Sequence, residues 1–136
     1  MDWLSESARI TAGVVLLATV TVTSGGAFLV RVATGGQPAT DFQRSFYRAG
    51  HGHAGVLIIL GLVCLMLAEA TSLQGGWHWL ASTGVLISAI VIPAGFFFSA
   101  MGTGRTRPNR VIVLLIAGIA LLVLSLIVLG IGLLMG

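Results

Sequence analysis

The sequence predicts an all-α polytopic membrane protein, an up-down-up-down bundle of four transmembrane helices. Of its 136 residues, 57% are hydrophobic and only 8% are charged, and four long apolar runs are separated by short polar segments. A soluble domain carries about a quarter of its residues as charged side chains. This chain has too few charges to cover a water-facing surface, so we expect the lipid bilayer to be its main partner.

We expect a single transmembrane domain over residues 1–136, because each apolar run exceeds the roughly 20 helical residues that cross a bilayer. The four spans are predicted at residues 10–31, 49–70, 79–101 and 111–135. The first follows an acidic flank rather than the basic flank of a secretory signal, so we expect it to be retained. Residues 41–48 are polar with interleaved aromatic side chains, which predicts a short helix lying in the membrane interface with its aromatic side toward lipid.

The basic residues predict the orientation of the four spans. All of them are arginines, and all but Arg9 flank the first and third connections between the spans. Because positive residues favour the cytoplasmic side, we expect these two connections in the cytoplasm and both termini outside. Arginines spread thinly over loops do not form a nucleic-acid-binding patch, so no nucleic-acid partner is expected.

Residues 46–55 carry most of the chemistry that the chain could perform. They include the only tyrosine and two of the three histidines. On a helix, His51 and His53 lie about 200° apart, so one metal ion bound by both would need an irregular backbone, which Gly50 and Gly52 permit. Otherwise the two histidines serve different helix faces, or they lie in the interface and bond to water, lipid phosphate or loop carbonyls.

We predict one polar site at the cytoplasmic edge of the bundle. The second and fourth spans begin at the same depth there, and their first turns offer free N–H groups and a positive dipole end that suit an anion or a carboxylate. Asp41 is the nearest acid. The predicted site comprises Tyr47, Arg48, His51, His53, Arg105, Arg107 and Arg110.

Two further features of the spans are candidates for function. Glu69 shares a helix face with His51 and is a candidate proton relay, or else an interfacial residue that ends the second span. In the fourth span, small residues recur every seven positions at Gly118, Ser125 and Gly132. Such a stripe lets helices approach closely, which is consistent with packing inside one chain or with contact in an oligomer.

The run FYRAGHGHAGVL at residues 46–57 resembles a group of small uncharacterised bacterial four-span membrane proteins. The resemblance covers the chain from about residue 46 onward and implies the bacterial cytoplasmic (inner) membrane. The His-x-His pattern also resembles the histidine-bearing helices of haem–copper membrane proteins, which implies haem or copper held by His51 and His53. Those proteins carry further histidines on other helices at matching depth, whereas His78 is predicted at the opposite face.

Three functions are consistent with these residues. The first is a non-catalytic bundle, an accessory component that binds a partner membrane protein or a homo-oligomer, with no cofactor required. The second is a haem- or copper-binding redox protein that uses His51 or His53. The third is an oligomeric proton or small-solute channel with Glu69 on its path. An enzyme is not favoured, because the sequence has no Ser-His-Asp set, no paired carboxylates and no Cys-His pair close in sequence.

Overall fold

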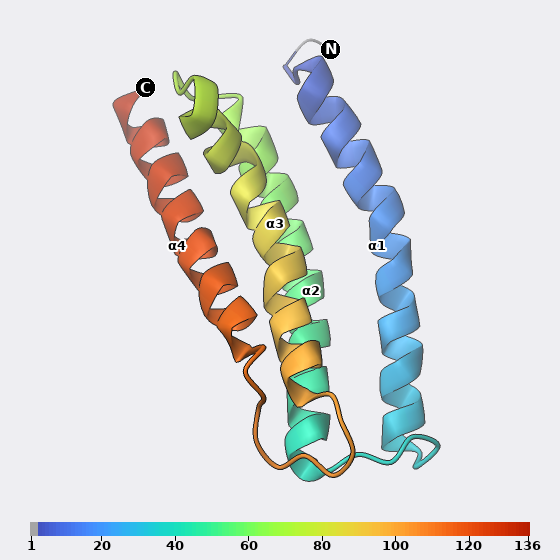
Figure 1. The fold of residues 1–136 in the computed structure, drawn as a ribbon. Coiled ribbons are helices and arrows are strands. Elements are labelled where there is room, and N and C mark those ends of the chain that lie inside the picture. Colours follow the sequence, from blue (N-terminus) through green and yellow to red (C-terminus); the bar gives the residue numbers. More distant parts are fainter. Residues whose placement is uncertain (1–2) are drawn as a thin grey trace.

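The computed structural model describes residues 3–136 as four long helices joined by three connections (Figure 1). The helices are α1 (Glu6–Ala33), α2 (Asp41–Ala68), α3 (Gly75–Ala100) and α4 (Ile112–Met135). Each is long and apolar enough to cross a membrane. Both termini and the α2–α3 connection lie at one end, which we call the terminal end, and the other two connections lie at the opposite loop end (Figure 1). The predicted four-helix up-down bundle is confirmed.

The start of α2 differs from the sequence-based expectation. The separate interfacial helix expected at residues 41–48 is instead the first two turns of α2. The helix begins there because Thr40 and Gln43 form a capping box, in which each side chain accepts a hydrogen bond from the backbone N–H of the other, at 3.2 and 3.1 Å. No proline interrupts the turns that follow, and the helix continues through Gly50 and Gly52.

Helix α3 lies between α2 and α4 and forms the centre of the bundle. Glycines let the backbones approach closely on both of its sides. A Cβ atom added at Gly61 of α2 would lie 2.4 Å from Leu86, and one added at Gly95 of α3 would lie 2.5 Å from the backbone nitrogen of Leu115 in α4. Close backbone approach through small residues is typical of helix packing in membranes, where dispersion forces replace the hydrophobic effect.

The small-residue stripe of α4 packs inside the chain. A Cβ atom added at Gly118 or Gly132 would collide with Ile92 or Leu73, and Ser125 is completely buried against Gly84. Of the two alternatives that the sequence left open, the structure therefore shows intramolecular packing. An oligomer would have to use another surface.

Helix α1 stands apart from the other three helices (Figure 1). It packs mainly against α2, and none of the residues in its most apolar stretch is buried. Its buried residues, Ala8 and Val32, lie near its two ends. At the terminal end Ala8 packs with Leu65 and Leu86, and at the loop end Val32 packs in a cluster that includes Tyr47.

Candidate functional site

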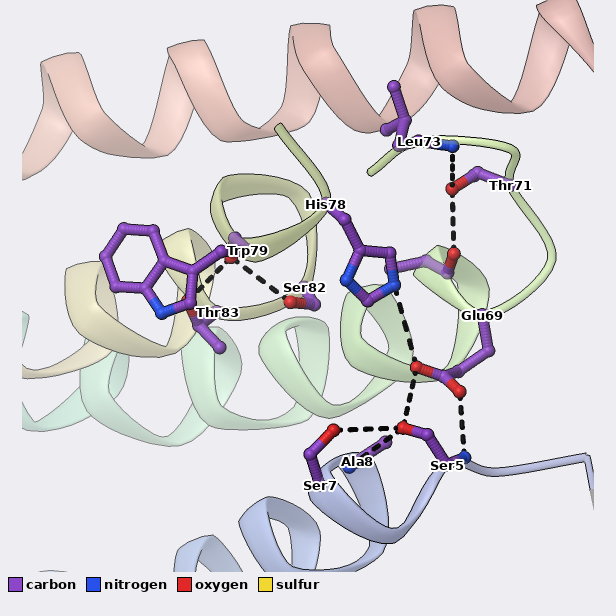
Figure 2. Close-up of polar contacts among 11 residues, drawn as sticks. Ser5, Ser7, Ala8, Glu69, Thr71, Leu73, His78, Trp79, Ser82 and Thr83 are labelled. Atoms are coloured by element: carbon purple, nitrogen blue, oxygen red, sulfur yellow. Dashed lines mark hydrogen bonds and ion pairs between the residues drawn. The ribbon is translucent and has the colours of Figure 1, made fainter. Parts of the chain in front are cut away.

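A carboxylate at the terminal end joins the ends of three helices (Figure 2). Glu69 is the C-terminal cap of α2. Its Oε2 accepts a hydrogen bond from the backbone N–H of Ser5 at 2.8 Å, and its Oε1 accepts one from the Ser5 hydroxyl at 3.1 Å. The Nε2 atom of His78, in the first turn of α3, lies 3.6 Å from Oε1.

The electrostatic setting explains why a carboxylate is stable at this position. Glu69 is only 15% exposed, and it follows the C-terminus of its own helix, where the helix dipole disfavours negative charge. Ser5, however, is the N-cap of α1, and its Oγ accepts from the N–H of Ala8 at 3.2 Å. The positive end of α1 and the two donors of Ser5 thus stabilise the charge.

A polar pocket of about 230 Å³ opens beside Glu69. Helix α3 contributes Ser82 and Thr83 to it, and both hydroxyls donate to the carbonyl of Trp79, at 3.1 and 2.7 Å (Figure 2). Each hydroxyl oxygen keeps lone pairs that can accept a hydrogen bond. The pocket is lined by Ser7, Ala8, Thr11, Leu65, Glu69, Gly75, His78, Trp79, Ser82 and Thr83.

An apolar groove between α1 and α3 shares lining residues with this pocket. It has a volume of about 430 Å³, and its floor is formed by Ala54 and Ile58 of α2. Thr11 and Thr83 line both the groove and the polar pocket. The other lining residues are Val15, Ala18, Thr19, Thr21 and Val22 of α1 and Leu86, Ile87, Ala89 and Ile90 of α3.

The predicted polar site lies at the loop end, where its aromatic member is buried. Tyr47 packs between Phe28 of α1 and Phe97 of α3, with ring centroids 5.2 and 5.3 Å away. Its hydroxyl is directed to the carbonyl of Ala100 at 3.5 Å. Tyr47 therefore joins three helices. Although it is only 8% exposed, it also lines a pocket of about 710 Å³ with Phe28, Gln43 and residues 101–104.

The predicted arginines line two different pockets. Arg48 is exposed and shares a pocket of about 380 Å³ with Asp41, Arg44 and Ser45. Among residues 3–136, no arginine forms an ion pair with Asp41 within 4.0 Å. The third connection forms its own pocket of about 350 Å³, lined by residues 102–107 and therefore by Arg105 and Arg107. Arg110 is exposed beyond it.

The two predicted histidines point to different helices. His51 packs against α1, where a Cβ atom added at Gly25 would lie 3.2 Å from its Nδ1. The Nδ1 atom of His53 is hydrogen-bonded to the carbonyl of Ala49 at 2.7 Å, and its ring lies 5.1 Å from that of Phe96 on α3. Residues 50–53 are regular helix, so the two imidazoles do not converge. In the part of the chain that the structure describes, no group of three or more His, Cys, Asp or Glu residues could hold a metal ion.

Sequence reasoning missed two of the polar contacts that organise the molecule. Gln43 is only 4% exposed, and its amide donates to the carbonyls of Ala100 and Gly102 at 2.9 and 2.6 Å. Its spacing from Thr40 is the signal of a capping box, which would have placed the start of α2. The contact of Glu69 with Ser5 has no local signal, because the two residues are 64 positions apart.

Comparison of the chain with protein-family models, curated proteins and solved structures gives no match. The polar pocket and the groove share Thr11 and Thr83 in their linings. At the loop end, by contrast, Tyr47, Arg48 and Arg105 line three different pockets.

Proposed function

We propose that this four-span membrane protein is a non-catalytic component that acts by binding a second membrane molecule in the groove between α1 and α3. It would serve either as an accessory component or as a self-associating protein. The observation that carries this proposal is the arrangement of α1, whose buried residues lie near its two ends while the groove lies open between them. Concave apolar surfaces between helices are usual ligand and partner sites in bundles.

The chemistry of the chain supports binding rather than catalysis. Cys64 is the sole thiol, and it is buried in a cluster with Ala68, Val85 and Leu129. In such surroundings cysteine behaves as a small apolar side chain. The carboxylate of Glu69 is already held by two hydrogen bonds from Ser5, an arrangement that suits a structural and binding role.

The geometry gives less support to the other two functions. A haem or copper site that used both His51 and His53 would require α2 to unwind around Gly52, because regular helix directs the two rings apart. A proton path from His51 to Glu69 would have to cross the apolar floor of the groove at Ile58. Conduction along this face would therefore need polar groups from another molecule.

The arginines at the loop end support a further part of the proposal. Arg44, Arg48 and Arg107 are exposed there. We propose that the loop end lies in the cytoplasm of a bacterial cell, with both termini outside. Exposed arginines at that level contact the anionic headgroups of the inner leaflet and hold the protein in its orientation.

The proposal is tested by filling the groove. Ala18 is exposed on α1 and lines the groove, whereas Ala120 is exposed on α4 outside it. We expect native mass spectrometry of the purified protein to detect a bound mass, either a lipid-sized molecule or a second chain. The Ala18→Trp variant should lose this mass and the matched Ala120→Trp variant should keep it. Equal binding in the two variants would refute the role of the groove.

A further inference from the structure

We infer that the groove and the polar pocket together bind a single-chain amphiphile with a hydrogen-bond-donating head. Its hydrocarbon tail lies in the groove between α1 and α3, and its head contacts Glu69, Ser82 and Thr83. This inference rests on the proposed function and specifies the ligand class. It assigns the two cavities to the two halves of one molecule.

The two cavities are adjacent and are placed at the right depths for such a ligand. Thr11 and Thr83 line both of them. The polar pocket is at the terminal end beside Trp79, and tryptophans mark the level of the lipid headgroups. The groove runs from there along α1 to Val22, a length of about 16 Å at 1.5 Å per helical residue. An amphiphile anchored at the headgroup level would therefore extend its tail toward the bilayer centre.

The size of the groove favours a hydrocarbon chain over a partner helix. One turn of a helix with its side chains is about 10–12 Å wide and 5.4 Å long and fills roughly 400–600 Å³. A helix that followed the groove for about 16 Å would make about three turns and fill more than about 1,200 Å³, whereas the groove has a volume of about 430 Å³. Spread over about 16 Å, this volume gives a cross-section of roughly 27 Å², which is wide enough for a methylene chain about 4 Å across and too narrow for a helix about 10 Å across.

The threonines in the middle of the groove need no hydrogen bond from an occupant. The hydroxyl of Thr19 donates to the carbonyl of Val15 at 2.8 Å, and that of Thr21 donates to the carbonyl of Ala18 at 2.6 Å. Threonines that bond to their own helix in this way leave mainly their methyl groups to contact a ligand. The tail needs no hydrogen-bonding group, and an unsubstituted hydrocarbon fits.

The polar pocket offers acceptors and therefore selects a donor. An ionised carboxylate only accepts hydrogen bonds, and Glu69 lines the pocket. The protons of Ser82 and Thr83 are already directed to the carbonyl of Trp79, so their oxygens remain as acceptors. No arginine is among the described residues that line the pocket. A hydroxyl or ammonium head is complementary to these acceptors. A phosphate would instead place a second anion beside the Glu69 carboxylate, which already receives the two hydrogen bonds of Ser5 and faces His78.

The experiment compares three probes that share one tail: oleyl alcohol, oleylamine and oleyl phosphate. Their binding to the full-length protein in lipid nanodiscs is measured by native mass spectrometry. We expect oleyl alcohol or oleylamine, or both, to bind at least about tenfold more tightly than oleyl phosphate. The relative affinities of oleyl alcohol and oleylamine distinguish a neutral hydroxyl ligand from a cationic amine ligand. Oleyl phosphate binding as tightly as the other two would overturn the inference.

Variants separate the head from the tail. Glu69→Gln should abolish the preference against oleyl phosphate, because it removes the negative charge while keeping the size of the side chain. Glu6→Gln is its control, because it makes the same change at an exposed carboxylate of the same end that does not line the pocket, and it should retain the preference. An unchanged preference in Glu69→Gln, or its loss in Glu6→Gln, would show that the Glu69 carboxylate does not select the head group.

The groove variant distinguishes a failure of this inference from a failure of the proposed function. Ala18→Trp should weaken binding of every probe, because the shared tail is excluded. If Ala18→Trp removes the bound mass while the three heads bind alike, the proposed function stands and the amphiphile head site is wrong. The proposed function also stands, and the amphiphile head site is also wrong, if the bound mass that Ala18→Trp loses is a second protein chain. If Ala18→Trp binds every probe as the wild type does, both fail.

Discussion

Helices α3 and α4 meet backbone to backbone at Gly95, which makes this position a sensitive test of the packing. A Cβ atom added there would lie 2.5 Å from the nitrogen and 2.8 Å from the Cα of Leu115. Ordinary contacts of a Cβ atom begin at about 3.4 Å, so Gly95→Ala requires the helices to separate by nearly an ångström. No flexible side chain can absorb this movement, because the atoms in the way belong to the backbone.

The magnitude follows from two opposing terms. Overpacking a tightly packed interior costs about 1–3 kcal/mol, whereas replacing glycine by alanine inside a helix contributes about 1 kcal/mol of stability. Gly55→Ala is the matched control, because Gly55 is also helical and has no other atom within 4 Å of an added Cβ. The helix term cancels between the two variants. We therefore expect Gly95→Ala to be less stable than Gly55→Ala by about 1–3 kcal/mol.

The assay is reversible unfolding in mixed micelles of a mild detergent and dodecyl sulfate, followed by circular dichroism. The free energy of unfolding is compared at the same dodecyl sulfate fraction for the wild type, Gly95→Ala and Gly55→Ala. If the two variants unfold with the same free energy, α3 and α4 do not meet backbone to backbone at Gly95, and close packing at this glycine is refuted.

Three further predictions concern the other contacts. Gln43→Ala removes three hydrogen bonds, one from the N–H of Thr40 and two to the carbonyls of Ala100 and Gly102, and should lower the free energy of unfolding by roughly 1–3 kcal/mol. Gln74→Ala should change it little because Gln74 is exposed and makes no capping bond, and equal effects would contradict the role of Gln43. Gly118→Leu should destabilise the chain itself, so unfolding followed by circular dichroism that shows a helical protein of unchanged stability would contradict the packing of α4. Alkaline phosphatase fused after Gly136 should be active, and an inactive fusion would reverse the proposed orientation.

Hydropathy predicted the fold because membrane-spanning helices are the strongest signal that such a chain contains. The fourth span was predicted at 111–135, and α4 is Ile112–Met135. The start of α2 was misplaced because polarity was taken as the boundary of the span. The helix instead begins where its first N–H groups are capped, at Thr40, so its first two turns are polar and still belong to the same helix.

The candidate site was less predictable because it depends on which helices are neighbours. Glu69 and Ser5 are separated by 64 positions, and periodicity within one helix carries no information about such a contact. For a similar reason, the sequence could not show whether the small-residue stripe of α4 packs inside the chain or against another copy, since glycine allows close approach to any neighbour. By contrast, the angular argument for His51 and His53 needed only helix geometry, and the two rings do point to different helices.

The placement of α1 connects the stability of the protein with its proposed function. In lipid an apolar helix gains little from burying apolar surface, so specific contacts must hold α1 against the bundle. Those contacts lie at its ends: Ser5 with Glu69 at the terminal end, and Phe28 with Tyr47 at the loop end. Between them the helix is not required to touch α3, because lipid or ligand hydrocarbon can fill the gap without an unfavourable exposure to water. The same end contacts thus fix α1 and keep the groove open.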